Sequence, residues 1–175
     1  GEEEEPASLL CSAIKAVEGQ PGRFVGQLVI HGSPESSDIS AMRDFFTEST
    51  ELGLDWYGPE RIRPLFYHHK MDEGMNEAMK KELTRDPRIG TVGLFEDKLG
   101  QTWVDGQLDL SKRYWQRIWG MIQDGKLHLS ADSAPHLIDR QPAAKGANEL
   151  LLFPILGCSL TVTPAEFRLP PVRPA

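Results

Sequence analysis

The residues of this chain that are best suited to chemistry are two adjacent histidines, His68 and His69, and a serine further along, Ser130. The histidines stand in the stretch "FYHHKMDE", between a hydrophobic run and a pair of acids. A serine hydroxyl becomes a nucleophile only where a base reaches it, ideally with a third group that orients the base. His69 is a candidate base for Ser130, but sequence spacing alone does not show whether the fold joins them.

The two histidines also allow a metal site, with Asp72 as a further ligand. Successive side chains of an extended strand point to opposite faces, so a regular strand does not aim both imidazoles at one ion. The spacing of two zinc-binding histidines four residues apart on a helix is absent. The simplest alternative is one packed and one exposed histidine, and we expect neither a metal nor an organic cofactor.

Composition describes an acidic chain of one-domain size. Its 175 residues are enough for one domain with a sizeable core. The net charge of −7 provides no basic field for nucleic acid or for an anionic membrane. No apolar stretch approaches the roughly 20 residues of a membrane span. Two cysteines, Cys11 and Cys158, are too few for a disulfide framework and fit a reducing compartment.

The elements that must position the candidate residues are mainly strands. β-Branched and aromatic residues predict strands over 22–32 and 61–69, and a hairpin of 88–97 with 101–110. The clearest helix is 111–125, in which Ser111 is a candidate N-cap and Ile118 and Ile122 share one face with Tyr114. A second helix is predicted over 75–87.

Ser130 is expected at the end of a short strand, "KLHLS", where the chain enters the loop "ADSAPH". The run 149–163 reads as one or two further strands. About six or seven strands with two or three helices indicate an α+β, mostly β domain, either a barrel or a sandwich with mostly antiparallel strands. We expect an acidic, partly disordered lead-in over 1–20, one domain over 21–167 and a Pro-rich tail over 168–175.

The order of these segments resembles the prohead (capsid maturation) proteases of tailed bacteriophages. The matching pieces include "LVIHGSPESSDI", "PLFYHHKMD", "WVDGQLD", "GMIQDGKLHLSADSAPHLI" and "FPILGCSLTVTPAEF". These proteases are serine peptidases related in fold to the herpesvirus assembly proteases. The resemblance therefore implies a herpesvirus-protease-like, closed or partly closed antiparallel barrel with flanking helices.

The resemblance also implies residue roles. The histidine motif of these proteases is similar to Tyr67, His69 and Asp72, with Lys70 in place of a glycine, so His69 is the implied general base. The segment before their nucleophile is similar to "GKLHLS", so Ser130 is the implied nucleophile, with Ser133 as the fallback. Backbone N–H groups just after Ser130 would help to form the oxyanion hole.

The third member of the expected triad is missing. Relatives often carry an acid two residues before the serine of "SLT", where this chain has Gly157. Glu149 precedes Gly157 in the chain and would lie about 26 Å from it along an extended strand, which is too far for Glu149 to replace the acid. His136, Asp132 and Asp139 lie closer in sequence to Ser130 and are the remaining candidates for the third member, with His136 named first.

The function that the resemblance implies is a serine endopeptidase without cofactors. It would cleave phage scaffold and major capsid proteins, with autocleavage as a further outcome, inside the immature prohead in the host cytoplasm. Analogy also allows a homodimer, and no nucleic acid or membrane partner is expected. The alternative, favoured by Gly157 and Asp132, is a catalytically silent protease-fold module that binds scaffold or portal partners during assembly.

Overall fold

The structure, a computed structural model, describes residues 20–38, 42–67, 77, 81, 87–113, 115–161 and 170–174. Its strands are β1 (Arg23–Gln27), β2 (Asp44–Phe45), β3 (Ile62–Tyr67), β4 (Arg88–Glu96), β5 (Thr102–Leu108), β6 (His128–Asp132), β7 (Asp139–Pro142), β8 (Asn148–Leu152), β9 (Gly157–Thr161) and β10 (Arg173–Pro174). Its helical elements are α3 (Trp115–Gln123) and the 3-10 turns η1 (Pro135–Leu137) and η2 (Ala144–Gly146). The fold is mostly β, as predicted.

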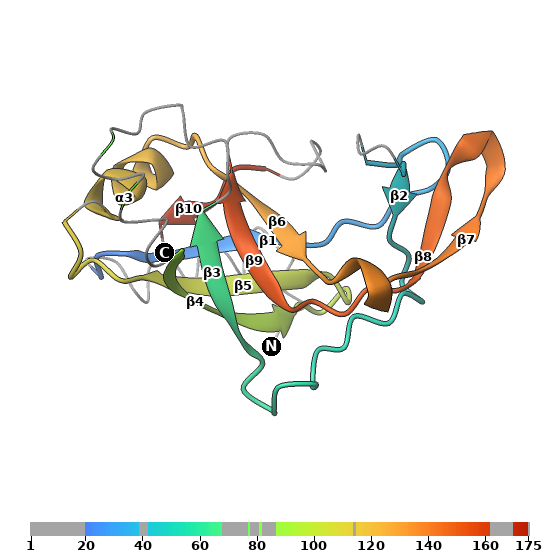
Figure 1. Ribbon diagram of the computed structural model, residues 1–175, viewed down its shortest axis with the longest axis horizontal. Coiled ribbons are helices and arrows are strands. Elements are labelled where there is room, and N and C mark those ends of the chain that lie inside the picture. The colour runs from blue at the N-terminus through green and yellow to red at the C-terminus, as the bar shows by residue number, and fades with distance from the viewer. Residues whose placement is uncertain are drawn as a thin grey trace.

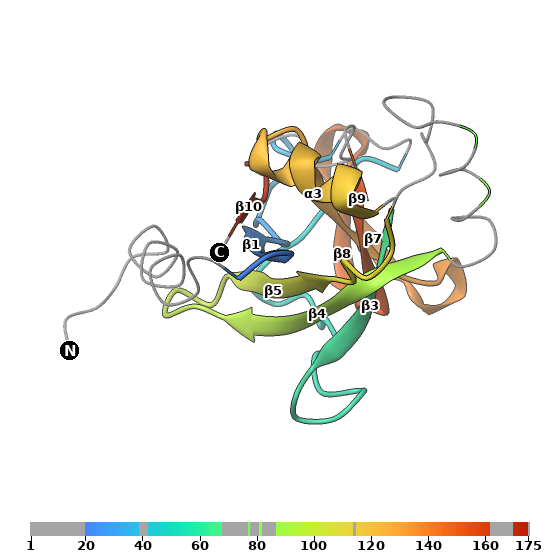
Figure 2. The same ribbon diagram turned by 90° about the vertical axis from the view of Figure 1, so that its left-hand side faces the viewer.

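Seven strands form one curled sheet in the order β10-β1-β5-β4-β3-β9-β6. Figures 1 and 2 show this sheet wrapping into a half-barrel. Neighbouring strands are antiparallel except for β3 and β9, which run parallel. The predicted hairpin is β4 with β5, and its register aligns Gly93 with Asp105.

The inner side of the half-barrel holds the core, and α3 packs against it. Trp115, Ile118 and Ile122 of α3 are fully buried, which confirms the predicted apolar face for Ile118 and Ile122; Tyr114, also predicted there, lies outside the described residues. Their sheet partners in the core include Phe24, Leu65, Val104, Leu129 and Leu160. Figure 2 shows α3 lying over the sheet near β9 and β10.

The start of α3 differs from the prediction. Ser111 is not the N-cap, because the carboxylate of Asp109 accepts hydrogen bonds from both its backbone N–H and its hydroxyl. This local turn uses the serine side chain before the helix begins at Trp115. In the other predicted helix, the two described residues, Glu77 and Lys81, are helical.

The two ends of the curled sheet approach each other. The backbone N–H of Val172 donates to the carbonyl of Leu127, 2.8 Å away, just before β6. A Cβ atom at Gly26 in β1 would lie 2.8 Å from side-chain carbons of both Leu129 and Val172. The Pro-rich end of the chain, expected at the domain edge, thus supplies edge strand β10 and a buried valine.

The predicted strand region 149–163 is two strands in two different sheets. β8 joins β2 and β7 in a three-stranded sheet, whereas β9 lies inside the large sheet. In the small sheet Arg140 holds the mostly buried Asp44 with two hydrogen bonds of 2.8 and 2.9 Å. Pro154 lies between the two strands, where the chain leaves one sheet for the other.

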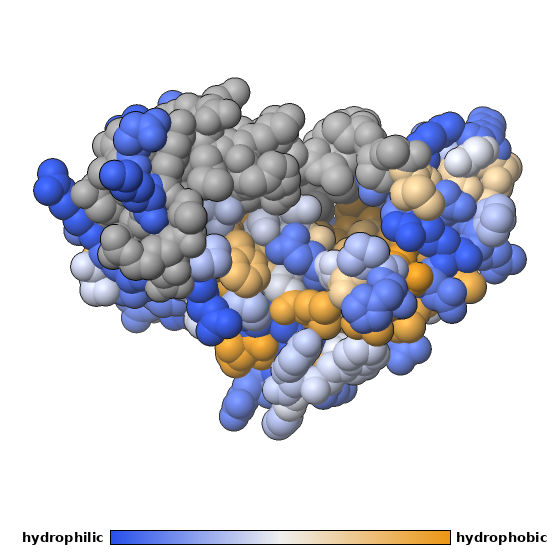
Figure 3. All heavy atoms as spheres, viewed as in Figure 1, coloured by the Kyte–Doolittle hydropathy of each residue, from blue (hydrophilic) through white to orange (hydrophobic). Residues whose placement is uncertain are grey.

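The surface seen in Figure 3 combines polar ends with hydrophobic atoms gathered near the centre of the face. Exposed large hydrophobic residues on the molecule include Trp56, Tyr57 and Ile62. None of the helices that the structure describes is long and apolar enough to cross a membrane.

Candidate functional site

Ser130 lies in the middle of β6, not at its end. The strand continues to Asp132 because residues 131 and 132 pair with Cys158 and Gly157 of β9. Ser130 itself is directly opposite Ser159. The predicted nucleophile is therefore held by a regular sheet, one strand away from β9 and two strands away from β3.

Alternation along the strands assigns Ser130 to the outer face of the half-barrel. Leu129 is 1% exposed and Cys158 and Leu160 are fully buried, so these residues face the core. Side chains of a strand alternate between faces, which leaves Ser130 and Ser159 on the other side of the sheet. Ser130 is half-buried and Ser159 is 4% exposed, so the outer face around these two serines is partly shielded from water.

Asp132 lies on the same outer face as Ser130 and Ser159, and its side chain is hydrogen-bonded to Ser159. The hydroxyl of Ser159 donates a 2.6 Å hydrogen bond to Oδ2 of Asp132. Burial raises the pKa of the Asp132 carboxyl, and the hydrogen bond from Ser159 acts in the opposite direction. Asp132 also helps to raise the pKa of the buried Cys158 thiol, for which burial is the main cause. The thiol faces the core and is unsuited to act as a nucleophile.

Gly157, which stands where an acid is expected, is directly opposite Asp132. A Cβ atom at Gly157 would lie 3.2 Å from a ring carbon of Phe66 and 3.3 Å from the carbonyl oxygen of Pro64. Such contacts are tight, so the local packing of β3 leaves little room for any side chain at this position. The packing of β3 on β9 is therefore tight around the position where an acid is expected.

The histidine pair follows directly after β3. Tyr67, the last residue of β3, pairs with Leu160, the residue after Ser159. His68 and His69, together with Asp72, lie outside the described residues. The roles predicted for these residues therefore stay predictions.

The remaining candidates for the third triad member and for the nucleophile differ in their burial and in their place in the fold. His136 lies in η1 and is exposed, and Asp139, at the start of β7, is exposed as well. The hydroxyl oxygen of Ser133 is buried and has no hydrogen-bond partner in the described part of the chain. Glu149 belongs to β8 in the small sheet.

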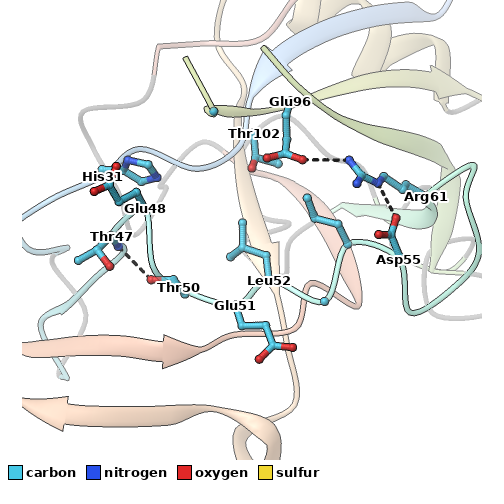
Figure 4. Close-up of a pocket in the computed structure, with 13 residues that line it drawn as sticks. His31, Thr47, Glu48, Thr50, Glu51, Leu52, Asp55, Arg61, Glu96 and Thr102 are labelled. Atoms are coloured by element: carbon cyan, nitrogen blue, oxygen red, sulfur yellow. Dashed lines mark hydrogen bonds and ion pairs between the residues drawn. The ribbon is translucent and has the colours of Figure 1, made fainter. Parts of the chain in front are cut away.

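A polar pocket of about 340 Å³ lies elsewhere, between the loop 47–55 and the β4–β5 turn. Figure 4 shows Arg61 reaching both Asp55, at 2.9 Å, and Glu96, at 3.2 Å, across this pocket. Arg61 has a φ of 56°, an unusual backbone conformation for a residue with a side chain. The pocket combines segments that are far apart in the sequence, and none of the predicted catalytic residues lines it.

Over the described residues, no group of three or more His, Cys, Asp or Glu side chains gathers in a way that could hold a metal ion. The predicted alternative of His68, His69 and Asp72 falls outside those residues. The described part of the Ser130 site offers hydroxyls and one carboxylate, which suit proton transfer and hydrogen bonding.

Sequence reasoning missed Ser159. Its importance depends on the pairing of β6 with β9, which aligns Ser130 with Ser159 and Asp132 with Gly157. The sequence signal is weak: both segments have small or polar residues at alternating positions, in "LSAD" and "GCSLT". Alternation shows that these residues share a face within each strand, but not which strands become neighbours.

Comparison of the chain with models of protein families, with curated proteins and with solved structures finds no match.

Proposed function

We propose that this chain is a serine endopeptidase that uses Ser130 as its nucleophile and His69 as its general base. The observation that carries the proposal is the order β3-β9-β6. The strand before His69 and the strand that holds Ser130 flank the same central strand. The end of β3, which directly precedes His69 in the chain, therefore lies in the same sheet as Ser130, with one strand between them, and this supports pairing the two residues.

The proposed reaction is acyl transfer. The Ser130 oxygen attacks the scissile carbonyl carbon while His69 accepts the hydroxyl proton, and backbone N–H groups bind the resulting oxyanion. The tetrahedral intermediate then collapses, the peptide C–N bond breaks and the imidazolium returns the proton to the leaving amine. Water, deprotonated by the same histidine, hydrolyses the acyl-enzyme and frees Ser130.

The donors for the oxyanion belong to the strand that carries the nucleophile. In the described part of the sheet, β6 is a terminal strand. One edge of β6 pairs with β9, and its outer edge has no partner strand there. Backbone N–H groups of a strand point alternately to its two edges. An N–H group next to Ser130 on the outer edge is therefore a candidate donor.

The resemblance to prohead proteases suggests the biological setting. The half-barrel would be a herpesvirus-protease-like fold, and the substrates would be phage scaffold and major capsid proteins, with autocleavage as a further activity. The reaction would take place inside the immature prohead in the host cytoplasm, and a homodimer remains a proposal by analogy.

Intact mass spectrometry over time tests the proposal. We would incubate the protein with scaffold and major capsid proteins, in parallel with Ser130→Ala, Ser133→Ala and the exposed-site control Ser49→Ala. Cleavage by the wild type and by the Ser133 and Ser49 variants, with none by Ser130→Ala, is the expected result. Cleavage that survives in Ser130→Ala would contradict the assignment of the nucleophile.

The second candidate function is a silent assembly module that binds scaffold or portal partners. The tight packing of Pro64 and Phe66 around Gly157 favours it, because this packing leaves little room for a triad acid at that position. Reaction with a fluorophosphonate separates the two functions, since Ser130 reacts readily only if a base activates it. A folded protein that neither cleaves nor labels would support the silent module.

A further inference from the structure

We propose that the polar pocket between the loop 47–55 and the β4–β5 turn binds an aliphatic ammonium group, supplied by a small amine or by a lysine side chain of a polypeptide. The inference goes beyond the proposed peptidase and does not depend on it, because no residue assigned to catalysis lines this pocket. Every residue on which it rests belongs to the described part of the chain.

The pocket has a fixed frame, because the loop 47–55 is bonded to the small sheet. The hydroxyl of Thr50, a buried residue, donates to the backbone carbonyl of Leu150 at 2.7 Å. The backbone N–H of the next residue, Glu51, donates to the carbonyl of Leu151 in β8 at 3.0 Å. The walls are therefore held in place by the fold itself, as in most sites for small molecules, which are largely formed before the ligand binds.

The charges that line the pocket are mostly negative. The lining includes a single guanidinium, that of Arg61, and the carboxylates of Glu48, Glu51, Asp55 and Glu96. Figure 4 shows Glu48 on one side of the pocket and Glu96 on the other, while the carboxylate of Glu51 points away from it. Without Glu51, three carboxylates still surround one guanidinium. The local field therefore favours a cationic ligand over an anionic one.

Arg61 does not reverse this balance, because its guanidinium is already bonded to two carboxylates. It donates to Asp55 at 2.9 Å and to Glu96 at 3.2 Å, so an anionic ligand would have to compete with both acids. A cationic ligand instead uses the remaining acceptor positions, since one carboxylate accepts up to about four hydrogen bonds. His31, which also lines the pocket, adds at most one positive charge, and the three carboxylates still outnumber the cations.

Thr102 is an independent sign that the pocket takes a ligand. It is 2% exposed at the start of β5, and it lines the pocket next to Glu96 (Figure 4). Its hydroxyl has no hydrogen-bond partner among the residues that the structure describes. A hydroxyl that is withdrawn from water without a partner costs free energy, which a bound N–H donor recovers. Thr102 and Glu96 together therefore offer two acceptors to one ammonium group.

The size of the pocket and its apolar lining favour an aliphatic cation. The volume of about 340 Å³ is at the lower end of the range for small-molecule sites. Leu52 and Leu54 line the pocket together with the acids. The methylene stem of a lysine or an alkyl amine packs on such leucines while its charged end reaches the carboxylates. The acids of the described residues do not gather in a way that could hold a metal ion, which also favours an organic cation.

An NMR chemical-shift titration at pH 7 tests the inference. The probes are the cations n-butylammonium and Nα-acetyl-lysine N-methylamide, the neutral butanol and the anion butyrate. We expect at least one cation to shift the backbone amide signals of Leu52, Gly100 and Thr102 in a saturable way, and butanol and butyrate to leave them unchanged. Failure of both cations to saturate the folded protein would overturn the inference. Equal or tighter binding of butanol or butyrate would overturn it as well.

The two cations also distinguish the source of the ammonium group. Tighter binding of the lysine derivative than of butylammonium supports a lysine side chain of a polypeptide, because the peptide groups then add contacts of their own. Equal or tighter binding of butylammonium supports a small free amine. Both results support the chemistry that the two sources share.

Single substitutions test whether the cation binds in this pocket. Glu48→Gln and Glu96→Gln each remove one carboxylate and should weaken the binding of the cation by about two- to fivefold. Thr102→Val removes the hydroxyl at nearly constant size and should weaken it by about two- to tenfold. The matched controls are Glu60→Gln and Thr91→Val, at exposed positions outside the pocket, and they should bind the cation as the wild type does.

Wild-type affinity in all three pocket variants would place the cation elsewhere on the protein and overturn the inference. Glu48 is exposed, so Glu48→Gln keeps the test decisive even if Thr102→Val, at a buried position, fails to fold. The outcome is separate from that of the peptidase. Absence of cleavage and of fluorophosphonate labelling contradicts the proposed function alone, whereas absence of saturable cation binding contradicts this inference alone.

Discussion

Arg63 joins three separate segments through one buried side chain. It is 1% exposed, and its guanidinium donates to the backbone carbonyls of Gly53 and Leu54 at 3.0 Å and to that of Ile155. It also lies over the ring of Tyr57, 4.6 Å from the centroid. Burial lowers the pKa of Arg63, but a guanidinium keeps its proton in proteins. The residue therefore fixes the loop before β3 and the segment before β9.

Replacement of Arg63 by methionine should strongly destabilise the fold. Methionine fills similar space but leaves three carbonyl groups, two buried and one partly buried, without their donor, and each unsatisfied buried group costs about 1–3 kcal/mol. We expect the free energy of unfolding to fall by about 3–5 kcal/mol in urea denaturation. Arg117→Met, at an exposed position of α3, is the control and should change it by less than about 0.5 kcal/mol. Equal effects of the two variants would refute the bridging role.

Asp132 makes stability depend on pH in a defined direction. Burial raises its pKa in the folded protein, so the folded state holds this proton more tightly than the unfolded chain does. The free energy of unfolding therefore decreases as pH rises from the ordinary pKa of about 3.9 through the raised value. At higher pH the folded protein carries the full cost of a buried carboxylate.

Asp132→Asn should remove this dependence, because asparagine accepts the hydrogen bond of Ser159 without a charge. Urea denaturation at pH 4 and at pH 7 measures the effect. We expect the stability of the variant relative to the wild type to be greater at pH 7 than at pH 4. The opposite order would mean that the carboxylate is stabilised, and not penalised, by its surroundings.

At the scale of elements, local sequence patterns predicted where the strands lie better than which strands pair with one another. Apolar alternation located β3 and the β4–β5 hairpin, and the spacing of Ile118 and Ile122 located α3. The end of β6 was misplaced, because Asp132 is a poor strand former that pairing with Gly157 nevertheless holds in the sheet. The parallel pairing of β3 with β9 depends on contacts distant in sequence, and no local pattern carries it.

Two glycines offer a matched comparison of element packing. Gly157→Ala would bring a methyl group within 3.3 Å of the carbonyl oxygen of Pro64, in backbone that does not move easily. We expect a loss of about 1–3 kcal/mol in the free energy of unfolding. Gly120→Ala, in the interior of α3 with open space around it, should instead add about 0.5–1 kcal/mol. Thermal unfolding of both variants checks the signs, and a stabilising Gly157→Ala would show that the position has room.

At the scale of the molecule, the candidate site is a product of the sheet order. The sequence supplied His69 and Ser130 as candidates, through residue type and a family resemblance. Ser159 and the pairing of Asp132 with Gly157 became visible only when β9 was found between β3 and β6. Strand order depends on how all strands share one core, so no single segment of the sequence determines which residues meet there.

Because Ser130 lies on β6, at one end of the sheet order, the site also depends on how the two ends of the half-barrel are held together. Val172 is 1% exposed, and it bridges the two ends of the sheet by contacting Gly26 of β1 and by bonding to Leu127 before β6. Val172→Ala keeps the backbone bond but removes the packing, which should cost about 2 kcal/mol. Because this contact holds the edge of the strand that carries Ser130, local opening should increase there more than elsewhere.

Hydrogen exchange measured by mass spectrometry should therefore show faster exchange in peptides covering β6 and β10 of Val172→Ala, with β4 changed less. Leu99→Ala is the control, since Leu99 is 65% exposed in the β4–β5 turn and its truncation should leave exchange in β6 unaltered. Uniformly faster exchange across all strands would mean that Val172 supports the whole core and has no particular role in closing the sheet. Selective loosening of β6, accompanied by slower reaction of Ser130 with a fluorophosphonate, would link closure of the half-barrel to the geometry of the site.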